Sequence, residues 1–252
     1  MATSTIEMFN DSFQNWKRHL SCKAQLIISD PPYNLAENMY ASNPMWYVGG
    51  DNKNGESEFA KKAAFDTDFD FRPAEWMHFC SRLLVKEPKE KGKAPCMIIF
   101  CGFEQLMQYI ELGRRYGFNH YINLVFRKNY SPQVLKANMK IVGNCEYGLV
   151  LYRDKLPKFN NNGRMIFNCI DWPRDTVTPK VHPTQKPVKL LEMLIELFTD
   201  PGEVVIDPTA GSGSTLIAAA NCGRRAYGFE IKKEYCRAFE ERMRPCIQPK
   251  LF

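Results

Sequence analysis

Asp30-Pro31-Pro32-Tyr33 is the stretch of sequence around which this chain is organised. It follows Ser29 and the apolar run 25–28, a pattern typical of a short buried strand that ends in a turn. The two prolines fix their own φ angles and disfavour helix in the residue before each of them, so the turn is stiff. This strand end presents a carboxylate, a backbone carbonyl and an aromatic ring together. In open α/β sheets, ligands bind beyond such strand ends.

A second strand end lies near the other terminus. The apolar run 203–206 leads into a glycine-rich turn, and an apolar helical run, 216–220, follows. Glycines let the backbone approach a phosphate or a nucleoside closely. The turn is not Gly-x-Gly-x-x-Gly and no Walker lysine follows it, which disfavours dinucleotide and nucleoside-triphosphate binding. The cofactor-binding residues predicted here are Asp207, Pro208, Thr209, Ala210, Gly211, Ser212 and Gly213.

An acidic residue follows this turn at the distance expected of a ribose ligand. The run 226–229 reads as the next strand, and Glu230 ends it about 20 residues after the turn. A carboxylate at such a strand end binds the hydroxyl pair of a ribose. We therefore expect Glu230 to complete a nucleoside site with the glycine-rich turn.

These motifs together resemble the amino-methyltransferases of DNA, which use S-adenosylmethionine to methylate exocyclic amines. The tetrapeptide 30–33 comes first and the glycine-rich turn 207–214 comes last, an order similar to that of the family's beta class. The segment 182–187, His-Pro-Thr-Gln-Lys-Pro, resembles the segment that precedes the cofactor turn in that class. The three motifs cover nearly the whole chain.

The resemblance implies a set of site residues. Asp30, Pro31, Pro32 and Tyr33 are the expected catalytic residues, and Asp30 also approaches the cofactor. Asp11, Ser12, Thr184 and Lys186 are further cofactor contacts, the first two at the adenine ring. By this resemblance, an Asp rather than a Ser before Pro-Pro-Tyr is more often the adenine-N6 form of the motif than the cytosine-N4 form. The expected substrate is double-stranded DNA with the target adenine flipped out against Tyr33.

Three alternatives remain beside a DNA methyltransferase of adenine or cytosine. The same chemistry serves RNA, so an RNA adenine methyltransferase is one. A nucleic-acid-binding protein that has lost catalysis is another, although the intact tetrapeptide 30–33 argues against it. A nicotinamide dehydrogenase is disfavoured, because that tetrapeptide would then have no role.

Length and pattern predict a single α/β domain over residues 1–252. The chain is 44% hydrophobic, which is enough for a full core at this size. Alternating strands and helices predict a doubly wound, mainly parallel sheet, with strands 121–127 and 147–152 as an antiparallel pair. Residues 34–65 show no periodicity, and we expect either a mobile loop that closes over the substrate or a segment that is disordered without substrate.

The positive charge is concentrated in one segment. The chain carries +6, and residues 153–189 hold eight basic against three acidic residues. We expect the part 153–181 to recognise the DNA target, and because it is small for this task, a second copy or a partner chain is expected to share the recognition. The predicted phosphate contacts are Lys155, Lys158 and Arg164, and Arg174 is the predicted base-reading residue.

Neither a metal site nor a membrane segment is expected. The nine cysteines have no C-x-x-C spacing, which is typical of buried thiols in a reducing compartment. No leader-like amino terminus and no run of about 18 apolar residues is found. The sequence therefore predicts a soluble cytoplasmic protein, of a prokaryote or of a virus in its host, with no metal.

Overall fold

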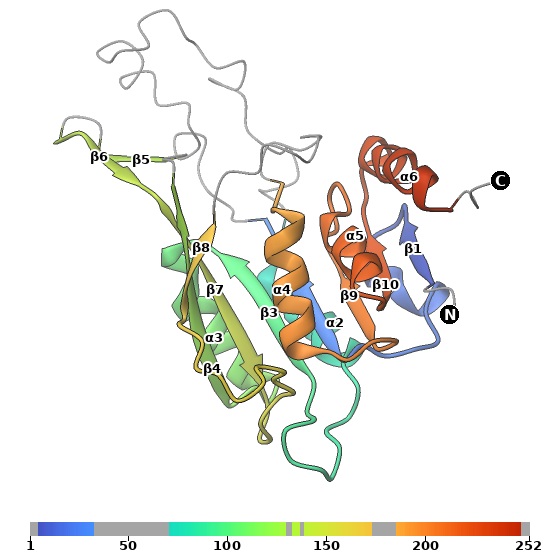
Figure 1. Ribbon diagram of the computed structural model, residues 1–252, viewed down its shortest axis with the longest axis horizontal. Helices are drawn as coiled ribbons and strands as arrows, with labels where there is room; N and C mark the ends of the chain where they lie inside the picture. Colours follow the sequence, from blue (N-terminus) through green and yellow to red (C-terminus); the bar gives the residue numbers. More distant parts are fainter. Residues whose placement is uncertain (1–4, 33–70, 130–132, 137–138, 173–184, 248–252) are drawn as a thin grey trace, which may run out of the picture.

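Most of the described chain forms one sheet with helices on both faces (Figure 1). The computed structural model describes residues 5–32, 71–129, 133–136, 139–172 and 185–247. The sheet has eight strands in the order β1-β10-β9-β2-β3-β7-β4-β8. These strands are β1 (Ile6–Phe9), β2 (Leu26–Ser29), β3 (Cys96–Cys101), β4 (His120–Lys128), β7 (Cys145–Tyr152), β8 (Cys169–Trp172), β9 (Val204–Asp207) and β10 (Arg225–Phe229).

The sheet is parallel except at β7, which runs antiparallel to both of its neighbours, β3 and β4. The chain leaves β2 toward β3 on one side, whereas it leaves β9 toward β10 on the other. The pair of β2 and β9 is therefore the point at which the winding reverses. The predicted doubly wound, mainly parallel sheet is confirmed, and so is the antiparallel pair, which is formed by β4 and β7.

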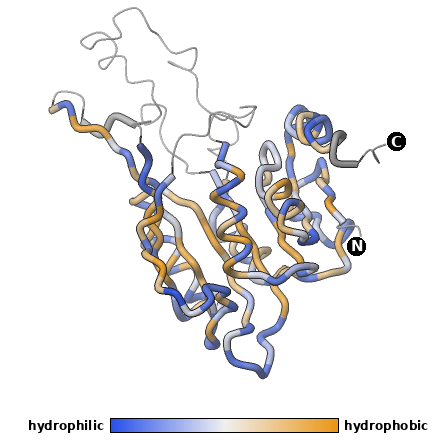
Figure 2. Tube along the Cα trace, in the orientation of Figure 1, coloured by the Kyte–Doolittle hydropathy of each residue, from blue (hydrophilic) through white to orange (hydrophobic). Residues whose placement is uncertain are grey.

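Two hydrophobic layers hold the helices on the sheet. The helices α4 (Val188–Phe198), α5 (Ser214–Asn221) and α6 (Lys233–Ile247) pack on one face. The helices α2 (Pro73–Leu83) and α3 (Leu106–Arg115) pack on the other, together with the 3-10 helix η1 (Phe13–Arg18). In β2, Leu26 and Ile28 face the first layer and Ile27 faces the second. Because strands buried on both faces need apolar residues throughout, the central strands are hydrophobic along their length (Figure 2).

Some local predictions differ from the structure. The sequence predicts a helix around residues 13–20, whereas the structure has a 3-10 helix that ends at Arg18. The sequence also predicts an amphipathic helix over 103–116, which the structure divides into the 3-10 helix η2 (Phe103–Gln105) and α3. Along the chain, β4 is followed by a short two-stranded sheet of β5 (Gln133–Lys136) and β6 (Ile141–Gly143), and β7 comes after it. The edge strand β8 lies within the basic residues 153–189, where no strand was predicted. Only one of its four residues is buried, so its sequence shows no buried-strand pattern.

Candidate active site

The carboxyl ends of β2 and β9 form the centre of the site. Because these strands pair in parallel, Asp30 and Asp207 leave the sheet at the same edge. The side-chain oxygens of Ser29 and Thr209 lie 2.7 Å apart and tie the two exits together. The strand pairing therefore brings the two motifs predicted from the sequence together at one edge. Pro31, which follows Asp30, is buried.

The glycine-rich turn is folded closely onto the end of β9. The backbone N–H of Thr209 donates to Asp207 at 3.1 Å, and that of Gly213 donates to the Ala210 carbonyl at 2.8 Å. Gly213 has a φ of +76°, and a Cβ there would overlap the ring of Phe239. Only glycine satisfies both conditions, so at Gly213 no side chain covers the backbone where the turn enters α5.

Glu230 lies against this turn, as the sequence predicts for a nucleoside site. Its Oε2 accepts from the Gly211 N–H at 2.9 Å, and its Oε1 accepts from the Lys232 N–H at 2.7 Å. Burial raises the pKa of Glu230 despite these two hydrogen bonds. The carboxylate is therefore fixed beside the backbone of the turn, at the end of β10.

Asp207 is the most deeply buried acid of the site. Burial raises its pKa to about 7, although hydrogen bonds with Thr215, Thr209 and Ser29 favour the carboxylate. The charge of Asp30 nearby adds to the increase. Asp207 thus anchors the turn internally, with its side chain inside the fold.

Lys186 joins the third motif to Asp30. Its Nζ donates to the Asp30 Oδ2, and its side chain is 7% exposed. Burial by itself lowers the pKa of Lys186, but the carboxylates of Asp30 and Glu146 outweigh it and raise this pKa. The lysine predicted as a cofactor contact is therefore bound to the predicted catalytic carboxylate.

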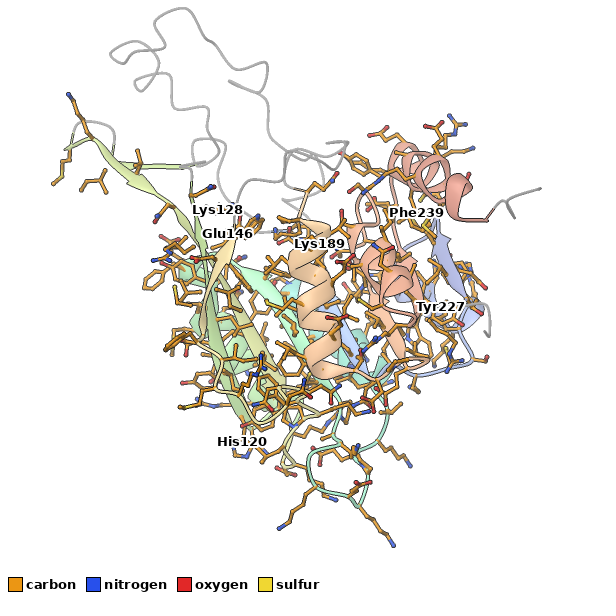
Figure 3. All side chains as sticks on the ribbon, in the orientation of Figure 1. His120, Lys128, Glu146, Lys189, Tyr227 and Phe239 are labelled. Carbon is orange, nitrogen blue, oxygen red and sulfur yellow. The ribbon has the colours of Figure 1, made fainter. Side chains whose placement is uncertain are left out.

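Sequence reasoning missed two residues of this edge, Lys128 and Glu146. Glu146 Oε1 accepts from Lys128 Nζ, and Glu146 Oε2 lies 3.3 Å from Lys186 Nζ. Figure 3 shows Lys128 and Glu146 together at the end of the sheet that also carries the start of α4. The available signal was a charge on each strand at one end of the antiparallel pair, because Lys128 ends β4 and Glu146 is near the start of β7.

Asp11 and Ser12 lie at the same edge, just after β1. The Asp11 carboxylate accepts from the Ser12 N–H at 2.8 Å and from Asn15 at 2.7 Å, and it lies 2.8 Å from the His19 ring. The hydrogen bond with His19, followed by that from Asn15, lowers the pKa of Asp11 to about 2. Ser12 caps η1. Both side chains organise the end of β1, and their contact with an adenine ring stays a prediction.

Several predicted residues lie outside the described part of the chain. They are Tyr33, the loop 34–65, Arg174 and Thr184. Pro32 is described and half-buried, and Arg164 is described and exposed. The predicted roles of all these residues stay predictions.

Two predicted DNA contacts, Lys155 and Lys158, lie away from the Asp30 edge. Lys158 is buried, and its Nζ is shared between Asp200 and Glu203. Lys155 donates to the Pro88 carbonyl at 2.6 Å. Both follow the end of β7, which lies opposite the Asp30 edge because β7 is antiparallel. Lys158 is therefore held inside the fold by two carboxylates, whereas the contact of Lys155 with DNA stays a prediction.

The described residues contain no metal-binding group. Within them, no three His, Cys, Asp or Glu side chains are arranged to hold an ion. Likewise, none of the described helices is long and apolar enough to cross a membrane.

Known proteins resemble this chain over most of its length. A family model described as DNA methylase matches residues 24–241. Putative methylase YubD of Escherichia coli is 34% identical over 151 residues, which make up 60% of this chain and 63% of YubD. DNA adenine methyltransferase YhdJ of the same organism is 32% identical over 136 residues, 53% of this chain and 42% of YhdJ. The chain thus spans less than two thirds of the length of either relative.

Solved structures share the fold. The complex of M1.HpyAVI with SAM superposes with a TM-score of 0.67 at 21% identity, covering 95% of this chain and all of that one. PvuII DNA methyltransferase, described as cytosine-N4-specific, has a TM-score of 0.64 at 17% identity, covering 99% of this chain and 89% of that one. At such identities the likeness is one of fold.

Proposed function

From the premise that this chain belongs to the DNA methylase family, we propose that it transfers a methyl group from S-adenosylmethionine to the N6 amine of adenine in DNA. The observation that carries the proposal is the parallel pairing of β2 and β9. It brings the Asp30 turn, with the amine-binding motif, beside the glycine-rich turn. Two sites with complementary chemistry therefore share one edge of the sheet.

The turn 207–213 and Glu230 fit the cofactor. The turn has glycines at 211 and 213, so its backbone is open to close approach by a ligand. Glu230 already accepts the Gly211 N–H and is held at the strand end where a carboxylate binds a ribose. S-adenosylmethionine supplies a methyl group made electrophilic by the sulfonium. The task left to the protein is to prepare the amine.

Asp30 and Pro31 are proposed to prepare that amine. An exocyclic amine is a poor nucleophile because its lone pair is conjugated into the ring. Its two N–H groups donate to the Asp30 carboxylate and the Pro31 carbonyl, which pulls the nitrogen toward tetrahedral geometry. The lone pair is then directed at the methyl group, and positioning provides much of the acceleration. The base has to leave the duplex to reach this edge, and Tyr33 is proposed as its stacking partner.

Adenine is preferred over cytosine on two grounds. Asp30 before Pro-Pro-Tyr resembles the adenine form of the motif, and the relative YhdJ is described as a DNA adenine methyltransferase. N4 of cytosine is the second candidate, because the PvuII enzyme, described as cytosine-N4-specific, shares the fold. Arg164, Arg174 and either a second copy or a partner chain are proposed to contribute to DNA contact.

Product analysis tests this function directly. The protein is incubated with isotopically labelled S-adenosylmethionine and double-stranded DNA, and the DNA is digested to nucleosides for mass spectrometry. Labelled N6-methyladenine is expected, and Asp30→Ala should abolish it while leaving the thermal midpoint near that of the wild type. Labelled N4-methylcytosine would transfer the proposal to the second candidate. Label in RNA but not in DNA would contradict the choice of DNA.

A further inference from the structure

We propose that Lys128, Glu146 and Lys186, here called the charge row, orient the Asp30 carboxylate for the incoming amine. The proposal rests on the proposed function and adds three positioning residues to it. None of the three is assigned to touch the reacting atoms. Lys186 acts on Asp30 directly, and the other two act through Lys186.

The charge row is continuous from β4 to β2. Lys128 Nζ donates to Glu146 Oε1, the Glu146 Oε2 lies 3.3 Å from Lys186 Nζ, and Lys186 Nζ donates to Asp30 Oδ2. Positive and negative charges therefore alternate, and the four groups together are neutral. A displacement of any member leaves a buried charge without one of its partners, which is costly. The position of Asp30 is consequently coupled to Lys128 on the far side of β7.

The antiparallel direction of β7 makes this row possible. Glu146 pairs with Phe126 near the end of β4, and Tyr147 pairs with Cys101 at the end of β3. The start of β7 is thus placed at the edge where the parallel strands end, as Figure 3 shows for Glu146 and Lys128. Lys186 comes from the segment immediately before α4. The charge row and Asp30 together bring four separate parts of the chain into contact.

Aromatic rings confine both lysines of the row. Lys186 Nζ lies 5.1 Å from the centroid of Phe100 and 5.6 Å from that of Trp172. Lys128 Nζ lies 4.4 Å from the same Trp172 ring. Ammonium groups over ring faces are attracted to them, and the rings exclude water from the pairs. The lysine side chains are thereby restricted to positions from which they reach Glu146.

Stability alone does not account for the charge row. Buried ion pairs contribute little to folding, since desolvation offsets most of the attraction. The row ends on the residue assigned to the amine, and Lys186 holds one of its two oxygens. A bound oxygen fixes the plane of the carboxylate and the direction of its lone pairs, which is what an acceptor of an oriented amine needs.

The opposite edge of the sheet provides a matched control. Lys158 is also a buried lysine shared by two carboxylates, those of Asp200 and Glu203, with the Glu203 contact at 2.7 Å. Its side chain is 6% exposed, against 7% for Lys186. Lys158→Met and Glu203→Gln therefore repeat the chemistry of Lys186→Met and Glu146→Gln away from the site. An effect on folding should appear in both pairs of variants, whereas an effect on Asp30 should appear only in Lys186→Met and Glu146→Gln.

Kinetics with wild type and these variants tests the proposal. Glu146→Gln should lower kcat roughly 10- to 100-fold, the loss seen when the supporting partner of a reactive group is removed. The dissociation constant of S-adenosylmethionine, measured by calorimetry, should change by less than about 3-fold. In a Lys186→Met background, Glu146→Gln should add little further loss, because its effect passes through Lys186. Glu203→Gln should keep the wild-type kcat. Equal losses in Glu146→Gln and Glu203→Gln, or additive losses in the double variant, would overturn the proposal.

A second readout does not depend on turnover. The ammonium resonance of Lys186, assigned as the 15N signal missing in Lys186→Met, should shift in Glu146→Gln, in Lys128→Met and in Asp30→Asn, but not in Glu203→Gln. An unchanged resonance in Glu146→Gln would refute the charge row. A wild-type protein that methylates neither adenine nor cytosine would refute the proposed function instead. The two failures are thus separate.

Discussion

The Oγ of Ser29 lies 2.7 Å from the Oγ1 of Thr209, across the junction between the two halves of the sheet. Ser29 ends β2 and Thr209 belongs to the glycine-rich turn, so this contact sets the spacing between the motifs proposed to bind the amine and the cofactor. Ser29 also hydrogen-bonds to Asp207 and is buried. One small hydroxyl therefore connects both strand exits.

Removing either hydroxyl should weaken this junction. Ser29→Ala should cost about 1–3 kcal/mol of unfolding free energy, because it deprives the buried Asp207 and the half-buried Thr209 of a hydrogen bond. Thr209→Val should cost less, since only the contact with Ser29 is lost. Urea unfolding of the two single variants and the double variant measures their coupling, expected at about 0.5–1.5 kcal/mol. A coupling energy indistinguishable from zero would mean that the contact contributes nothing.

Gly213→Ala should disrupt the fold more than the same substitution at another glycine with positive φ. Its φ of +76° costs about 1–2 kcal/mol for a residue with a Cβ. The added methyl would also overlap the Phe239 ring and approach the Met8 Cε to 2.9 Å, which adds about 1–3 kcal/mol. Gly92→Ala is the matched control, because φ there is +69° and nothing lies within 4 Å. Equal losses in chemical denaturation for both variants would show that the crowding has no effect.

Cofactor binding should stabilise the protein by an amount that grows with the logarithm of the cofactor concentration above the dissociation constant. At a cofactor concentration about 100 times the dissociation constant, the gain in unfolding free energy should be roughly 2.7 kcal/mol. Thermal unfolding with and without S-adenosylmethionine measures it, and Gly213→Ala should reduce the gain. NAD serves as the control ligand and should produce no shift. A shift with NAD but not with S-adenosylmethionine would revive the dehydrogenase alternative.

Asp207 should make folding stability depend on pH. Its pKa is raised by burial from 3.8 to about 7, so the folded state binds the proton more tightly than the unfolded chain does. The contribution is complete below about pH 4 and is lost as the pH rises to 7, with a size on the order of 4 kcal/mol. Asp207→Asn should flatten this part of the unfolding free-energy profile. Asp171→Asn, at an exposed pair with Arg127, should keep the wild-type slope.

The centre of the site was accessible to sequence reasoning because its signals are local. Asp30 and Asp207 each follow a short apolar run at a strand end, and the winding rule for α/β sheets brings such ends together. Glu230 follows from its distance along the chain. Each of these inferences needs only a strand, its exit and the order of motifs.

The remaining features of the site could not be predicted, because they depend on the direction and register of β7. Glu146 approaches Lys186 only because β7 is antiparallel, and 40 residues separate the two along the chain. The same direction carries Lys155 and Lys158 to the opposite edge, away from Asp30, although the antiparallel pair itself was predicted. The net charge of a segment does not reveal at which edge of the sheet its charged side chains lie.

Methyl transfer should decline at alkaline pH as Lys128 loses its proton. Burial lowers the pKa of Lys128 despite the opposing charge of Glu146, whereas Asp30 and Glu146 together raise the pKa of Lys186. Lys128 is therefore the lysine of the charge row that deprotonates first as pH rises. Glu146 then loses one partner and draws Lys186 away from Asp30, so kcat falls above the pKa of Lys128.

Lys128→Arg tests this assignment, because a guanidinium stays protonated throughout the accessible range. The alkaline fall in kcat should move to higher pH in Lys128→Arg, whereas Lys128→Met should show a low kcat without that fall. Lys158→Arg, at the opposite edge, should keep the wild-type profile. The measurement is kcat at saturating DNA and S-adenosylmethionine from pH 7 upward. An alkaline fall that is identical in wild type and Lys128→Arg would assign it to another group and disconnect Lys128 from the reaction.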